Sequence, residues 1–124
     1  MSPGLKLNQE EKLRRSRQFQ EIYAKGRRLS GPHLIFYFMP NELSHNRLGL
    51  SVSKRRFKLS VRRHYIQRRL REAYRLNKWC FLPGYDIVLN AQRFKEDEDR
   101  LADIQKEVLF LARRAGLLKS DEPI

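Results

Sequence analysis

The sequence has little cysteine and no long hydrophobic run. Cys80 is the single cysteine among the 124 residues, so the chain cannot form an internal disulfide. The longest apolar runs, residues 34–39 and 87–89, fall far short of the roughly 20 residues that a transmembrane helix requires. No apolar segment of the kind found in secretory signals follows the basic residues near the N-terminus. These absences indicate a cytoplasmic protein with no membrane span.

Acidic residues are also few. The chain has 14 Asp and Glu against 27 Lys and Arg, which gives a formal net charge of +13. Hydrophobic residues make up 40% of the chain. This is enough to close one modest core, so we expect a folded basic domain. Because no repeat or low-complexity linker divides the sequence, a single domain should span residues 1–124. We expect its ends, residues 1–12 and 117–124, to be flexible. Such a charge attracts polyanions, so nucleic acid or an anionic membrane surface is the expected kind of partner.

The positive charge is concentrated in the middle of the chain. Residues 54–75 hold ten Lys and Arg and one acid, Glu72, whereas residues 91–124 hold seven basic residues and eight acidic ones. A solvated helix face usually alternates the two signs, so an uncompensated segment of this kind indicates a binding surface. Guanidinium groups pair bidentately with phosphate oxygens, which suits RNA or DNA.

Apolar periodicity and capping residues predict three helices. The first begins at Ser16, as N-cap, and ends at Gly26, for which we expect the left-handed conformation. The second begins with Ser60 as N-cap. The third covers residues 101–115 and ends at Gly116.

Runs of β-branched and aromatic residues between turn signals predict the strands. They cover residues 33–38, 47–53 and 85–90, and the first two are expected to pair as a hairpin. Residues 27–30 form a further strand or a turn.

The helix that begins at Ser60 has two chemically different faces. At 100° per residue, Ile66, Leu70 and Ala73 lie on one side, which should pack on the sheet. The opposite side carries a cationic stripe of His64, Arg68, Arg71 and Arg75, with Gln67 at its edge. Together with the preceding loop of Lys54, Arg55 and Arg56, this stripe is the leading candidate for a nucleic-acid site.

Five aromatic residues are candidates for either packing or base stacking. Phe36 and Phe38 share one face of their predicted strand, and we favour core packing for both. Phe19, Tyr23 and Tyr37 fit equally well in the core or in a surface on which unpaired bases stack beside the cationic stripe. The pattern alone leaves both interpretations open for these three.

The remaining reactive residue types predict no catalytic group. The three histidines lie 12 and 19 residues apart with no clustered acid or cysteine, so neither a metal site nor a histidine-activated nucleophile is predicted. The acidic run at 96–99 is expected to stabilise the start of the following helix, with cation binding as the alternative. Cys80 is interpreted as a packing residue.

The central block is specific enough to compare with a known family. Residues 50–54 read Leu-Ser-Val-Ser-Lys, and residues 60–75 read Ser-Val-Arg-Arg-His-Tyr-Ile-Gln-Arg-Arg-Leu-Arg-Glu-Ala-Tyr-Arg. This block resembles the protein subunit of bacterial ribonuclease P, although His64, Tyr65 and Gln67 stand where that family has Asn, Arg and Lys. Residues 84–88 are similar to the start of the family's fourth strand. The family's N-terminal pattern is matched by Arg14, Phe19, Ile22, Tyr23 and Gly26.

The resemblance implies a fold. It is an α/β (α+β) two-layer sandwich with a four-stranded mixed sheet and three helices, in the order α-β-β-β-α-β-α. The family also has a left-handed βαβ crossover. General connectivity rules favour the right-handed form, so this expectation comes from the resemblance alone.

The resemblance also implies a function. The protein would belong to a ribonucleoprotein endonuclease that removes the 5′ leader from precursor tRNA. The RNA subunit would hold Mg²⁺ and hydrolyse the phosphodiester, while the protein would bind no cofactor or metal itself. Its partners would be ribonuclease P RNA and precursor tRNA, with the protein a monomer in a one-protein, one-RNA complex and no membrane involved.

Two groups of residues receive roles by the same resemblance. The contacts with the catalytic RNA would come from Arg63, His64, Gln67, Arg68 and Arg71. Two positive charges of the family are absent at Tyr65 and Gln67, and the cations that would compensate for them are Arg62, Arg69, Arg55 and Arg56. The cleft for the single-stranded leader would be lined by Phe19, Tyr23 and Tyr37.

Two other functions fit part of the sequence. A non-catalytic RNA-binding module, such as a ribosomal or tRNA-binding protein, would share the composition but would not support leader removal by a catalytic RNA. A protein-only nuclease needs converging carboxylates for divalent ions. The predicted strands, their connections and the basic helix offer only Glu42, Asp86 and Glu72, which are isolated from one another in the sequence.

Overall fold

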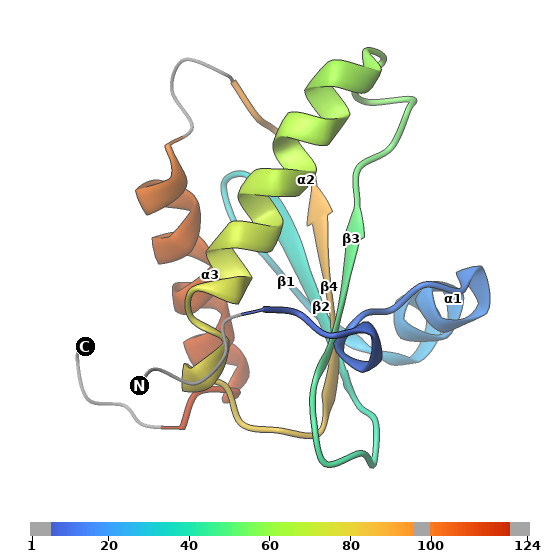
Figure 1. Cartoon of the computed structure of the whole chain (residues 1–124), viewed down its shortest axis with the longest axis vertical. Coiled ribbons are helices and arrows are strands. Elements are labelled where there is room, and N and C mark those ends of the chain that lie inside the picture. The colour runs from blue at the N-terminus through green and yellow to red at the C-terminus, as the bar shows by residue number, and fades with distance from the viewer. Residues whose placement is uncertain (1–5, 96–99, 120–124) are drawn as a thin grey trace.

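The computed structural model describes residues 6–95 and 100–119, which form one sheet with helices on both of its faces (Figure 1). The helices are α1 (Ser16–Lys25), α2 (Ser60–Arg75) and α3 (Leu101–Ala115), with short 3-10 helices η1 (Gln9–Glu11) and η2 (Lys78–Cys80). The strands are β1 (Arg27–Ser30), β2 (Leu34–Pro40), β3 (Arg47–Ser51) and β4 (Tyr85–Ala91). This order confirms the expected one, and residues 27–30 are a strand. The acidic run at 96–99 lies outside the described residues.

The strand order in the sheet is β1-β2-β4-β3. β2 pairs antiparallel with both β1 and β4, whereas β3 pairs in parallel with β4. The hairpin predicted between strands 33–38 and 47–53 is therefore wrong, because β4 lies between them. Residues 86–89 of β4 are all buried. The centre of the sheet is the position at which such a strand loses most contact with water, which explains the insertion.

The outer edge of β3 is covered by the chain that leads into α1. Lys12 forms a parallel bridge with Leu48, and the Leu13 N–H donates to the Leu48 carbonyl at 2.9 Å. This contact satisfies part of a strand edge that would otherwise expose unpaired backbone groups. It also fixes the N-terminal segment beside β3.

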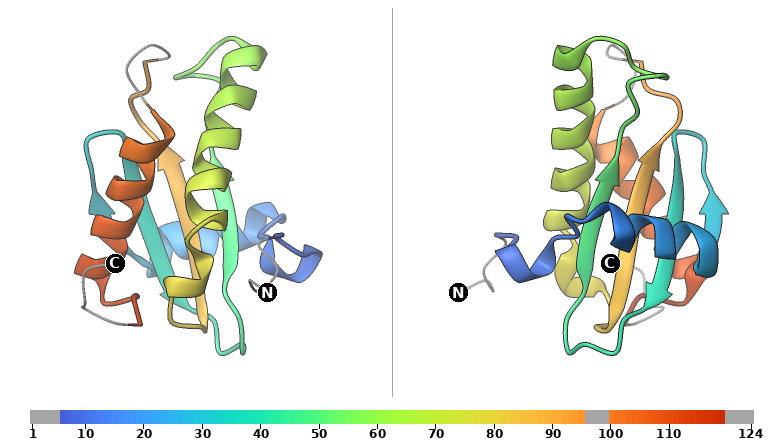
Figure 2. Two further views of the ribbon diagram at one scale, coloured as in Figure 1. Left: turned by 60° about the vertical axis from the view of Figure 1, so that its left-hand side comes forward. Right: turned by 90° about the vertical axis from the view of Figure 1, so that its right-hand side faces the viewer.

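α2 and α3 pack on one face of the sheet and α1 on the other (Figure 1). In the left view of Figure 2, α2 lies in front of β3 (green) and β4 (orange), and both strands point upward. The chain passes from β3 through α2 to β4, which lies to the left of β3. This is a left-handed crossover, the rare hand for such a connection. The feature implied by the family resemblance is confirmed.

The main core lies between the sheet and the helices α2 and α3. Phe36, Ile66, Leu70 and Ile104 are fully buried in it. Phe38 is 7% exposed, so the predicted core packing of the two phenylalanines is confirmed. Cys80 is also buried in this core, as expected for a packing residue, and burial raises the pKa of its thiol.

A carboxylate that the sequence analysis missed holds α3 to the start of β2. Glu107 is buried, and its Oε2 accepts hydrogen bonds from the backbone N–H groups of His33 at 2.9 Å and Leu34 at 3.0 Å. Its Oε1 lies 2.6 Å from Nδ1 of His33. These contacts satisfy a group that would be costly to bury without partners.

The helix ends differ in detail from the predictions. Ser16 and Ser60 are the first residues of α1 and α2, not their N-caps, which are Arg15 and Leu59. Gly26 ends α1, but with φ −78° and ψ 172°, which is extended rather than left-handed. Its lack of a side chain is still required, since a Cβ there would lie 2.5 Å from the Ile22 carbonyl oxygen. Gly116 ends α3 in the left-handed conformation, with φ +78°.

The described parts of the two expected flexible ends are packed. Leu117 is 1% exposed, and its carbonyl accepts the Leu82 N–H at 2.7 Å. At the other end, Nζ of Lys78 donates to the Lys6 carbonyl at 2.6 Å and to Oε2 of Glu11 at 3.1 Å. Residues 1–5 and 120–124 lie outside the described residues.

Candidate RNA-binding surface

The inner face of α2 fixes the direction of its outer face. Ile66, Leu70 and Ala73 are 0% exposed, so the predicted packing of this side against the sheet is confirmed. His64, Arg68 and Arg71 lie on the opposite side and are exposed to solvent. The amphipathic pattern of one helix therefore holds three of the predicted stripe residues on its outer side.

The charges of the stripe are mostly left without acidic partners. Among the described residues, no hydrogen bond or salt bridge engages the side chains of His64, Arg68 and Arg71. Arg75 differs, because its guanidinium forms a salt bridge with Glu72 one turn earlier. That pairing lowers the pKa of the Glu72 carboxyl. Glu72 thus partly neutralises the C-terminal end of the stripe, where it pairs with Arg75 and also attracts Arg71 electrostatically, whereas Arg68 and Arg71 form no salt bridge of their own within the described residues.

The loop before α2 is held in place by the helix. Nη1 of Arg63 donates to the carbonyls of Phe57 and Lys58, both at 2.9 Å. Phe57 is buried, and the Arg56 N–H donates to Oγ of Ser53 at 3.1 Å. Arg63, predicted to contact RNA, thus has a structural role as well. The loop displays the exposed side chains of Lys54, Arg55 and Arg56 next to the start of α2.

The two compensating cations on α2 pack against aromatic rings. The Arg69 guanidinium lies 5.1 Å from the centroid of the Tyr65 ring, and its Nε donates to the Tyr65 hydroxyl at 3.2 Å. The Arg62 guanidinium lies 5.9 Å from the centroid of the Phe57 ring. Stacking of this kind fixes a guanidinium plane without removing its charge.

The three predicted cleft aromatics come together on the other face of the sheet. The Tyr23 and Tyr37 rings meet edge to face at 4.8 Å, and the Phe19 ring lies 6.4 Å from that of Tyr23. Tyr23 is 39% exposed, and Phe19 and Tyr37 are half-buried. α1 crosses the strands and leaves part of this sheet face without a helix above it (Figure 2, right). The cluster combines packing with partial exposure, so base stacking at these residues stays a prediction.

Gly49 of β3 makes room for Phe19. A Cβ at this position would lie 2.6 Å from Cζ and 2.8 Å from Cε1 of the Phe19 ring. Any side chain here would displace the ring, so close approach rather than backbone conformation favours glycine.

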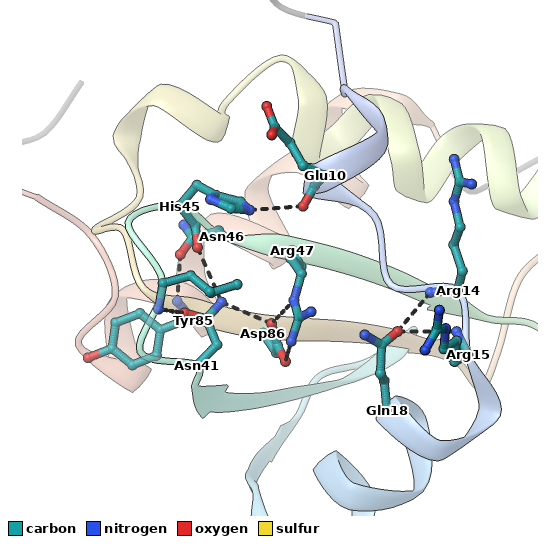
Figure 3. Close-up of polar contacts among 11 residues, drawn as sticks. Glu10, Arg14, Arg15, Gln18, Asn41, His45, Asn46, Arg47, Tyr85 and Asp86 are labelled. Carbon is teal, nitrogen blue, oxygen red and sulfur yellow. Dashed lines mark hydrogen bonds and ion pairs between the residues drawn. The ribbon is translucent and has the colours of Figure 1, made fainter.

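A part-buried ion pair between β3 and β4 was not predicted. Arg47 donates from Nε to Oδ1 and from Nη2 to Oδ2 of Asp86, at 2.8 and 2.7 Å, and Asn41 donates to the same Oδ1 at 2.9 Å (Figure 3). The hydrogen bonds that Arg47 donates to Asp86 raise the pKa of Arg47. Parallel pairing places Arg47 directly opposite Asp86, a relation that the sequence does not show. Asp86 is therefore a structural group rather than an isolated acid.

The described residues offer no metal-binding cluster and no membrane span. No group of three His, Cys, Asp or Glu side chains among them is placed to hold a metal ion. No helix in residues 6–95 or 100–119 is long and apolar enough to cross a bilayer.

Comparisons with known proteins give a consistent result. The family model named Ribonuclease P matches residues 7–116. The ribonuclease P protein component of Lachnoclostridium phytofermentans is 39% identical over 113 residues, which cover 91% of this chain and 96% of that protein. The ribonuclease P protein component of Clostridium botulinum strain Loch Maree is 37% identical over 109 residues, which cover 87% of this chain and 96% of that protein.

Solved structures agree with these relatives. The RNase P protein of Staphylococcus aureus superimposes with a TM-score of 0.75 at 29% identity, covering 88% of this chain and 98% of that one. The RNase P protein of Thermotoga maritima gives a TM-score of 0.76 at 28% identity, and the match covers 84% of this chain and 96% of that one.

Proposed function

The chain belongs to the family of bacterial ribonuclease P protein components, and from this we propose that it binds the RNA subunit through α2 and the 5′ leader of precursor tRNA through the aromatic cluster. The observation that carries the proposal is the outer side of α2, where Arg68 and Arg71 are exposed and form no salt bridge or hydrogen bond within the described residues. A phosphate backbone supplies the missing counter-charge.

The aromatic cluster suits the leader for a different reason. An extended single strand offers unpaired bases, and every base has a face that stacks on an aromatic ring. Tyr23 and Tyr37 present part of their rings to solvent beside each other. A base that stacks there would be held without regard to its identity, as a subunit that serves many precursor tRNAs requires.

The protein's contribution to the reaction is electrostatic and positional. Cations placed between two RNA molecules reduce the repulsion between their phosphates. The complex therefore forms at a lower salt concentration, and the RNA subunit holds its Mg²⁺ ions at a lower Mg²⁺ concentration. In this proposal the RNA subunit carries out the hydrolysis and no side chain of the protein breaks a bond. The protein acts as a cytoplasmic monomer with one RNA.

The direct test is the cleavage of a precursor tRNA by the catalytic RNA at low Mg²⁺, with and without the chain. We expect a large increase in the cleavage rate when the chain is present, and a much smaller one with Arg68→Ala/Arg71→Ala. A matched control is Arg113→Ala/Arg114→Ala, which removes two exposed charges from α3 and should behave like the unchanged protein. RNA binding without any increase in cleavage would instead favour a non-catalytic RNA-binding module.

A further inference from the structure

A hollow of about 200 Å³ lies where the N-terminal segment meets α2 around the edge of β3. Its apolar lining comes from Leu7, Leu13, Phe19, Leu48 and Leu50. Its polar lining comes from Lys12 and Arg14 of the N-terminal segment and from Gln67 and Arg71 of α2. Residues more than 50 positions apart in the sequence thus converge on one small space.

The polar side chains of this hollow are not engaged elsewhere in the described part of the chain. Among the described residues, no hydrogen bond or salt bridge engages the side chains of Lys12, Arg14, Gln67 or Arg71, and no acidic residue lines the hollow. The nearest acid of the N-terminal segment, Glu11, is paired with Lys78. Glu72, which does not line the hollow, attracts Arg71 electrostatically but is paired with Arg75. Three cations that form no salt bridge within the described residues, around an apolar floor, favour a ligand with both a charged and a flat apolar part.

The local structure holds this arrangement in place. Oε1 of Gln18 accepts hydrogen bonds from the backbone N–H groups of Arg14 and Arg15, at 3.2 and 3.1 Å. Figure 3 shows the Arg14 side chain extending away from Gln18. The bridge between Lys12 and Leu48 fixes the segment from its other side. Because the backbone is ordered before any ligand arrives, little conformational entropy is lost on binding.

We propose that the hollow holds one unstacked nucleotide of the RNA subunit. The base lies on the apolar floor, the Gln67 amide hydrogen-bonds to the edge of the base, and Lys12, Arg14 and Arg71 contact the adjoining phosphates. The volume supports a single base, since it lies below the roughly 300 Å³ at which pockets for drug-sized ligands begin. This inference rests on the proposed function, because it takes α2 to face the RNA subunit.

The position of the hollow favours the RNA subunit over the leader. Gln67 and Arg71 belong to the side of α2 that is proposed to contact that RNA. Tyr23 and Tyr37, the proposed leader contacts, do not line the hollow, whereas Phe19 lines it and has its ring centroid 6.4 Å from that of Tyr23. A nucleotide in the hollow and a leader base at Tyr37 would therefore occupy separate positions.

The test compares two variants in titrations of the RNA subunit without substrate. Lys12→Ala/Arg14→Ala removes two of the proposed phosphate contacts, and we expect about tenfold weaker binding and a plot of log affinity against log salt that is flatter by about one to two units. Leu50→Phe keeps every charge but narrows the hollow, so it should weaken binding about fivefold with an unchanged salt slope. Thermal melts confirm that each variant is folded.

The control is again Arg113→Ala/Arg114→Ala, which removes the same charge from α3. Binding by the Lys12 and Arg14 variant that is no weaker than binding by this control would overturn the inference. So would wild-type affinity for the RNA subunit combined with a loss that appears only for leader-containing precursor tRNA, since the occupant would then be the leader. Wild-type affinity of Leu50→Phe would show that no base enters. The proposed function is judged separately, by whether the unchanged protein increases cleavage at low Mg²⁺.

Discussion

The close approach of Gly49 and Phe19 predicts that Gly49→Ala lowers the stability of the protein and that a smaller residue at position 19 largely removes this effect. In Gly49→Ala the new Cβ would lie 2.6 Å from Cζ of Phe19 and 3.2 Å from Cβ of Leu13. An ordinary contact begins near 3.4 Å, so the ring must move by about 0.8 Å, the difference between 3.4 and 2.6 Å. The ring is the far end of a side chain and borders the hollow of about 200 Å³, so it has space to move into.

This freedom sets the size of the effect. Overpacking a well-packed site lowers the free energy of unfolding by about 1–3 kcal/mol. Because this ring can move into open space, we expect a loss at the lower end of that range, about 1–2 kcal/mol. For a domain of this size each kcal/mol lowers Tm by about 4 °C, so we expect a Tm lower by about 4–8 °C. The displaced ring also narrows the hollow and changes its contact with Tyr23, so affinity for RNA should fall even where the protein is fully folded.

A double-mutant cycle provides the assay. Phe19→Leu alone should destabilise the chain, because it removes ring contacts, but Gly49→Ala should cost much less in the Phe19→Leu background, where no ring meets the new methyl group. Tm and RNA affinity are measured for all four proteins. If the two substitutions are additive in Tm, the predicted clash does not occur and the reasoning for Gly49 is refuted.

Three further predictions follow from the site and its support. Tyr37→Ala should weaken the binding of leader-containing precursor tRNA to the holoenzyme by about 1–3 kcal/mol if a base stacks on that ring, with little effect on mature tRNA, whereas equal losses would indicate a packing role only. Asp86→Ala leaves the part-buried Arg47 without its carboxylate and should lower the free energy of unfolding by about 2–3 kcal/mol, measured by urea denaturation; a loss below about 0.5 kcal/mol would contradict the importance of this pair. Burial raises the pKa of Tyr74 to about 12, above the value of about 10 for an unfolded chain, so stability should fall as pH rises from 10 toward 12, by up to about 2–3 kcal/mol. Tyr74→Phe has no proton to lose, so the unchanged protein should lose stability relative to this variant over the same interval, and parallel curves would contradict the assignment.

The parts of the fold that depend on local pattern could be predicted from the sequence. The spacing of Ile66, Leu70 and Ala73 shows which side of α2 is buried, and this alone places Arg68 and Arg71 on the outer side. Similar apolar spacing predicts the other helices, and runs of β-branched and aromatic residues between turn signals predict three of the four strands. The salt bridge between Glu72 and Arg75 could also be predicted from the sequence, because residues three apart on a helix are neighbours.

The parts that depend on pairing between distant segments could not be predicted in this way. The position of β4 between β2 and β3 is a long-range choice, although its continuous apolar run is typical of a central strand. The pairs Arg47–Asp86 and His33–Glu107 join residues 39 and 74 positions apart. The left-handed crossover runs against the general rule, so only the family resemblance indicated it.

The central claim is that the outer side of α2 binds RNA through guanidinium groups that the protein leaves uncompensated. Its most direct test is the affinity for the catalytic RNA as a function of salt concentration, for the unchanged chain and for Arg68→Ala/Arg71→Ala. Both side chains are exposed, so the variant should fold normally. We predict weaker binding and a plot of log affinity against log salt that is flatter by about one to two units. The same affinity and the same slope for both proteins would contradict the claim.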